Sequence, residues 1–138
     1  MTNPTTPTTK MIGRHQIRYE PETGFICLRS RGIVDAQHVE QMLAVVEAYA
    51  GDEPAFVLAD DREVAGLTKD ARALLAKRVG RESYVATFGG SFAFRAIANV
   101  IVRGLQLLAD GFHFSSEPDE RTARMAHRKT SRIPRSNE

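Results

Sequence analysis

The chain has 138 residues, a formal net charge of +2, 42% hydrophobic residues and 26% charged residues. These values are typical of one globular domain, and the single cysteine, Cys27, excludes an internal disulfide and a cysteine-based metal site. The charge is unevenly distributed, because residues 121–138 hold six basic residues and one acidic residue, which leaves −3 on residues 1–120. Such a basic end is either a solvated terminus or a surface that binds nucleic acid, anionic lipid or an acidic partner.

The first segment of the chain is rich in threonine and proline. Residues 1–12 are therefore predicted to be a disordered leader, and they contain no apolar stretch typical of a signal peptide. The longest apolar tract of the chain carries Arg95 and Arg103, which argues against a membrane span. We therefore expect a cytoplasmic protein.

The next part of the chain is predicted to contain a hairpin and two helices. A turn at residues 21–24 separates two strand-like runs, His15–Tyr19 and Phe25–Ser30. Asp35 caps a segment whose apolar residues recur with helical spacing up to Gly51. After it we predict a buried strand at Ala55–Ala59, a loop at Arg62–Leu67 and a second helix capped by Thr68.

The remaining elements continue the alternation of strands and helices. We predict a strand at Ser83–Phe88, a tight turn at Gly89-Gly90 and a helix over Phe92–Leu108. A short strand at Phe112–Phe114 and a helix capped by Ser115 or Ser116 follow. Residues 130–138 are predicted to be a basic disordered tail. The order ββαβαβαβα predicts an α/β domain over residues 13–129. Its sheet is expected to be five-stranded and mostly parallel, with a hairpin strand at one edge and flanking helices.

Four stretches of the sequence carry a family resemblance: residues 56–61 (Phe-Val-Leu-Ala-Asp-Asp), the Ala71-Arg72 helix, residues 88–95 and Phe112-His113-Phe114. In this order they resemble the SpoIIAA-like, or STAS (STAS/SEC14-type), domain family over about residues 14–128. The resemblance implies a SpoIIAA-like fold and a bacterial regulatory module that binds proteins, has no enzymatic activity and uses no cofactor.

The same resemblance points to one possible phosphorylation site. In the anti-sigma factor antagonists of the family, a phosphorylatable serine starts the helix after the third strand, directly behind an aspartate. The matching hydroxyl here is Thr68, but six residues separate it from Asp61, and no Asp-Ser-Ser-Gly-like sequence is present. We expect Thr68 to be an ordinary helix cap, with phosphorylation as the alternative.

The carboxyl edge of the predicted sheet gathers a charged cluster, because parallel strands end together there. Its members are Asp60, Asp61, Arg72, Ser91 and Arg95. One interpretation is an anion site, since glycines and a helix amino terminus present free N–H groups. The favoured interpretation is an ion pair between Arg95 and one of the two aspartates, because a cation in the first turn of a helix opposes the helix dipole.

The segment over residues 92–108 is apolar on two sides of the predicted helix. The main stripe faces the sheet, and a second stripe around Arg103 consists of Phe92, Ala96, Val100 and Leu107. A helix of this kind covers a partner or is deeply buried. We predict a protein–protein contact, most simply a homodimer, and keep open a hydrophobic ligand groove or a cover formed by the last helix or the leader.

Other functions find less support in the sequence. Asp60-Asp61 lacks the further acids and the lysine of a phosphoreceiver site, and neighbouring carboxylates on a strand point to opposite faces. The histidines His15, His38, His113 and His127 have no metal-ligand spacing, and the basic tail has no aromatic residue for binding nucleic acid. The alternative to an interaction module is a small binding protein for a lipid-like or anionic ligand at the carboxyl edge, and an enzyme is a third, weaker option.

Overall fold

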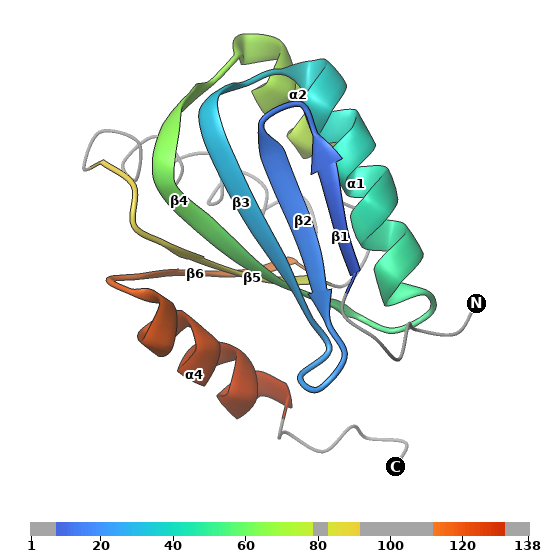
Figure 1. The fold of residues 1–138 in the computed structure, drawn as a ribbon, viewed down its shortest axis with the longest axis vertical. Coiled ribbons are helices and arrows are strands. Elements are labelled where there is room, and N and C mark those ends of the chain that lie inside the picture. Colours follow the sequence, from blue (N-terminus) through green and yellow to red (C-terminus); the bar gives the residue numbers. More distant parts are fainter. Residues whose placement is uncertain (1–7, 79–82, 92–111, 132–138) are drawn as a thin grey trace.

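A computed structural model describes residues 8–78, 83–91 and 112–131, in which a six-stranded sheet is flanked by helices on both faces (Figure 1). The strands are β1 (Thr8–Ile12), β2 (His15–Glu20), β3 (Phe25–Val34), β4 (Ala55–Leu67), β5 (Ser83–Phe88) and β6 (Phe112–Glu117). The described helices are α1 (Ala36–Ala50), α2 (Lys69–Arg78) and α4 (Glu120–Ser131). Helices α1 and α2 cover one face of the sheet, and α4 covers part of the other.

The strands follow the chain in space, in the order β1 to β6. The two ladders that join β1, β2 and β3 are antiparallel, and the three that join β3, β4, β5 and β6 are parallel. The five predicted strands are present, but the sheet is mixed, so the prediction of a mostly parallel sheet overstated the parallel part.

Strand β1 corrects the prediction that all of residues 1–12 form a disordered leader. Residues 8–12 pair with β2 from Thr8 opposite Tyr19 to Ile12 opposite His15, which leaves a two-residue turn. Gly13 in that turn has φ +58°, a conformation that glycine adopts without steric cost. Thr8, Thr9 and Ile12 are β-branched residues, which favour strands, and here they pair with β2.

Strand β4 is longer than predicted, because residues 62–67 continue it instead of forming a loop. The pairing with β3 shifts by one residue, from Arg29 opposite Asp60 to Arg31 opposite Glu63. This bulge reverses the alternation of side chains along β4. Val57 and Val64 consequently belong to the same core cluster, although they are seven positions apart, a spacing that puts two side chains on opposite faces of a regular strand.

Two of the three described helices begin where the sequence predicts. Asp35 caps α1, where its Oδ1 accepts a hydrogen bond of 2.8 Å from the backbone N–H of His38. The predicted caps of α4, Ser115 and Ser116, lie instead within β6, and Asp119 caps the helix with a 2.9 Å hydrogen bond from the backbone N–H of Thr122. The predicted helix at 92–108 lies outside the described residues. None of the helices in the described part has the length and apolar character needed to cross a membrane.

Each face of the sheet has its own apolar core. The larger core lies beneath α1 and α2, where Ile17 and Ile26 are fully buried and Tyr19 stacks on Tyr49. The smaller one lies beneath α4 and consists of Phe25, Leu58, Ala86, Phe88 and Ala123. Burial of one large apolar side chain stabilises a fold by about 1.5–3 kcal/mol, so both layers of helices are held mainly by these contacts.

Candidate functional site

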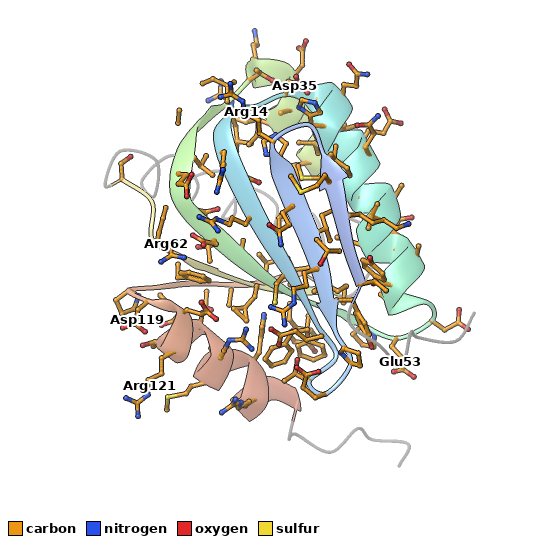
Figure 2. The ribbon with its side chains drawn as sticks, viewed as in Figure 1. Arg14, Asp35, Glu53, Arg62, Asp119 and Arg121 are labelled. Carbon is orange, nitrogen blue, oxygen red and sulfur yellow. The ribbon has the colours of Figure 1, made fainter. Side chains whose placement is uncertain are left out.

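Asp60 and Arg62 form a bidentate ion pair at the carboxyl end of the regular part of β4. The Nε and Nη2 atoms of Arg62 donate to the two carboxylate oxygens at 2.9 and 2.6 Å, and the backbone N–H of Arg62 donates at 3.1 Å. Burial alone would raise the pKa of Asp60, but the hydrogen bonds from Arg62 outweigh it and hold the pKa below its usual value. Figure 2 shows Arg62 near the end of α4 where Asp119 lies.

The glycine turn after β5 lies against this ion pair. The guanidinium of Arg62 is 5.6 Å from the centre of the Phe88 ring, and a Cβ atom at Gly89 would collide with the Arg62 side chain. Gly89 also has φ +78°, so both space and backbone conformation require glycine. The structure therefore brings Asp60 and the Gly89-Gly90 turn together, as the carboxyl-edge prediction expects.

The other members of the predicted cluster are placed differently. Ser91 is exposed at the end of the turn, and Arg95 lies outside the described residues, so its ion pair with an aspartate stays a prediction. Arg72 lies on α2, and among the described residues it forms no ion pair with Asp60 or Asp61. In the part of the chain that the structure describes, Asp60 pairs with Arg62, two residues along its own strand.

Asp61 follows Asp60 on β4 and is partly buried. Burial, with a smaller contribution from the charge of Asp60, raises the pKa of Asp61 to about 7. A carboxyl group with this pKa is partly protonated near neutral pH. The two adjacent aspartates thus differ in environment, since the pKa of the Asp60 carboxyl group is lowered and that of Asp61 is raised.

A hollow lined by three arginines lies at the same end of the sheet, where β1, β2 and β3 meet. We call it the arginine groove; it has a volume of about 390 Å³ and is lined by Met11, Gly13, Arg14, Gln16, Arg29 and Arg31. Beside it, Glu63 accepts from Arg29 at 2.6 Å and from Arg31 at 2.9 Å. Figure 2 shows Arg14 at this end of the sheet, beside the turn between β1 and β2. The sequence does not predict this groove, because one of its walls is β1, which was expected to belong to a disordered leader.

Thr68 caps α2, as predicted. Its Oγ1 accepts a 3.1 Å hydrogen bond from the backbone N–H of Ala71, and its own N–H donates to the carbonyl of Val34 at 3.0 Å. The hydroxyl is half-buried and thereby already has a structural role. Phosphorylation of Thr68 stays a prediction that these contacts do not test.

Replacing Thr68 with alanine should lower the free energy of unfolding by about 1 kcal/mol, because the N–H of Ala71 loses its acceptor. Thr68→Ser keeps an acceptor and serves as the control, with an expected change of a few tenths of a kcal/mol. Urea denaturation measures both. Equal loss in the two variants would show that the methyl group, and not the cap, stabilises α2.

The α4 face contains a buried ion pair that the sequence analysis did not predict. Arg124 donates from Nη1 and Nη2 to the two carboxylate oxygens of Glu20 at 2.8 and 2.7 Å, and from Nε to Glu120 at 2.8 Å. The side chain of Glu20 is only 5% exposed. The hydrogen bonds from Arg124 lower the pKa of Glu20 to about 2. Arg124 is therefore a structural residue and not part of a solvated basic end.

Cys27 lies beside this pair, with its Sγ 4.0 Å from Nη2 of Arg124. Burial and the charge of Glu20 raise the pKa of the Cys27 thiol to about 12. The thiol is thus protonated at neutral pH and is a poor nucleophile.

The described histidines are engaged in packing. Nε2 of the buried His127 lies 2.7 Å from the carbonyl oxygen of Val57, so Nε2 carries the proton that it donates. The rings of His15 and His38 meet edge to face, with centres 5.0 Å apart, and His38 lies 3.2 Å from Asp35. Among the described residues, no group of three histidine, cysteine, aspartate or glutamate side chains could hold a metal ion.

The comparisons with known proteins concern the fold. No family model and no curated protein matches the sequence. Among solved structures, the chain is similar to an uncharacterized protein of the DUF3478 family with a SpoIIAA-like fold from Shewanella loihica PV-4. The identity is 20% and the TM-score 0.54, over 88% of this chain and 91% of that one. The anti-sigma factor antagonist SpoIIAA in its unphosphorylated form aligns at 14% identity and a TM-score of 0.49, over 89% and 98% of the two chains. The chain therefore has a SpoIIAA-like fold, as the sequence resemblance implied.

Proposed function

We propose that this chain is a non-enzymatic regulatory module that binds protein partners and associates with a second copy of itself through residues 92–108. The observation that carries the proposal is the second apolar stripe of that segment in the sequence, formed by Phe92, Ala96, Val100 and Leu107 around Arg103. These residues lie outside the described part of the structure, so the proposal rests on their pattern.

The environments of three described ionisable groups support a role without catalysis. Asp60 is held by Arg62, Glu20 by Arg124, and His127 by a backbone carbonyl. Groups that are committed to such contacts stabilise the fold and are poorly placed to exchange protons with a substrate. The SpoIIAA-like fold agrees with a small module of this kind.

Light scattering coupled to size exclusion tests the self-association. We expect the wild type to be a dimer and the double variant Val100→Glu with Leu107→Glu to be a monomer, because two buried carboxylates would oppose an apolar contact. The matched control adds the same two charges to the exposed side of α1, as Gln41→Glu with Ala44→Glu, and should remain a dimer. A wild type that is already monomeric, with an unchanged double variant, would rule out the interface.

A second candidate function is the binding of a small anionic or lipid-like ligand at the carboxyl edge of the sheet. The specific observation in its favour is the arginine groove, a hollow at that edge that three arginines line. The predicted cluster of Asp60, Asp61, Arg72, Ser91 and Arg95 is a less favourable place for an anion, because Arg62 already neutralises Asp60 and Asp61 adds negative character.

A further inference from the structure

We propose that the arginine groove binds a small anion that carries a phosphate group, an inference that rests on the second candidate function. The volume of about 390 Å³ falls within the range of pockets that hold small ligands. Guanidinium groups bind phosphate oxygens with good geometry, and three arginines line this hollow together with Gln16.

The charge around the groove favours a dianion. Glu63 bonds to both Arg29 and Arg31, but one carboxylate neutralises only one of the two guanidinium groups. Arg14 forms no ion pair in the part of the chain that the structure describes. Three arginines and one glutamate leave two positive charges, which matches the charge of about −1.5 to −2 on a phosphate monoester at neutral pH.

The backbone beneath the groove is fixed before any ligand arrives. His15 is buried, and its Nδ1 accepts a hydrogen bond of 3.4 Å from the backbone N–H of Arg31. The ring of His38 packs so closely on the turn that a Cβ at Gly13 would come within 2.8 Å of its Nε2. A ligand therefore has to order little more than side chains, which lowers the entropic cost of binding.

The bulge in β4 is what brings Glu63 to the groove. In a regular strand, residues 60 and 63 point to opposite faces, but the extra residue places Asp60 and Glu63 on the face that carries Arg29 and Arg31. Those two arginine side chains remain 44% and 51% exposed, so they are accessible to an incoming anion. Glu63 would then compete with the ligand for them.

The lining also distinguishes a phosphate group from a nucleic-acid strand. Among the described residues that line the groove there is no aromatic ring on which a base could stack. Met11, which is 61% exposed, is an apolar contact at the rim and would suit a short aliphatic or sugar part of the ligand.

Titration of the full chain with pyrophosphate at low salt, followed by calorimetry, tests the site. We expect saturable binding that Arg14→Ala weakens by about tenfold, because a charge-assisted contact is lost. Glu63→Gln should strengthen binding by about fivefold, because it removes the competing carboxylate. The control Arg121→Ala removes the same charge from the exposed side of α4, far from the groove in Figure 2, and should bind as the wild type does.

Sedimentation with phosphatidylcholine vesicles, with and without phosphatidic acid, separates a lipid headgroup from a free phosphate. Binding to both pyrophosphate and the acidic vesicles, with the same dependence on Arg14, assigns a headgroup; binding to pyrophosphate alone assigns a soluble ligand. If Arg14→Ala and Arg121→Ala bind equally, the groove is not the site, although an anion could still bind elsewhere on the edge. If the chain does not bind pyrophosphate, the groove is not a phosphate site. If it binds neither pyrophosphate nor the acidic vesicles, the second candidate function is also wrong.

Discussion

Replacing Arg124 with methionine should lower the free energy of unfolding by about 3 kcal/mol, which would be a large part of the stability of a domain of this size. Methionine keeps most of the length of the side chain but leaves the carboxylate of Glu20 buried without its bidentate donor. The hydroxyl of Thr23 still donates to Glu20 at 3.0 Å, which keeps the loss below the upper range for a broken buried pair. Urea denaturation at pH 7 measures the change.

The matched control for this variant is Arg121→Met, at an exposed position of the same helix, and we expect a change within about 0.5 kcal/mol. The pH dependence provides a second readout. The pKa of Glu20 is about 2 in the folded protein and ordinarily 4.5, so its stabilising effect is complete above pH 4.5 and is lost as the pH falls toward 2. Arg124→Met should remove most of this acid dependence. If both methionine variants lose the same stability, the ion pair does not hold α4 in place.

Replacing Asp61 with asparagine should raise the free energy of unfolding at pH 8 by about 2 kcal/mol. A rise of the pKa from 3.8 to about 7 means that the folded protein resists ionisation of this carboxyl group, whereas the unfolded chain ionises it freely. For a fully buried group this difference would be worth about 4 kcal/mol, and the partial exposure of Asp61 reduces it. Asparagine has a similar shape and carries no charge.

The sign of the effect fixes its dependence on pH. At pH 4 the carboxyl group is protonated in the folded protein and only partly ionised in the unfolded chain, so Asp61→Asn should gain little. The gain should grow between pH 4 and 7 and level off above 7. Asp52→Asn, at an exposed position after α1, is the control and should show no such trend. A gain that is the same at pH 4 and pH 8 would contradict the raised pKa.

The elements that the sequence predicts well are those whose signals lie within a few residues. Helix α1 has an aspartate cap, a regular apolar stripe and a glycine stop, and the hairpin of β2 and β3 has an apolar run on each side of a polar turn. Thr68 at the start of α2 is also a local signal, because it caps the N–H of a residue only three positions away. The signals that mark these elements lie within their own segments, although packing on the core stabilises them.

The features that the sequence does not predict depend on distant parts of the chain. Glu20 and Arg124 are 104 residues apart, and no local pattern marks a glutamate at the end of a strand as buried. Strand β1 exists because β2 offers it a partner, and its sequence by itself is typical of a disordered segment. The ion pair of Asp60 with Arg62 could have been predicted from spacing alone, had residues 62–67 been recognised as a strand, because residues i and i+2 of a strand share a face.

The contact between Glu20 and Arg124 also bears on the order in which this protein can fold. A ribosome makes β2 and β3 about a hundred residues before α4, so Glu20 and the aromatic face around Phe25 stay in water while most of the domain is synthesised. The side of the sheet that packs on α1 and α2 can close early, since its contacts are nearer in sequence. The opposite side of the sheet is covered by α4 only after that helix has been synthesised. Before that, chaperones and proteases can reach the apolar surface of this side.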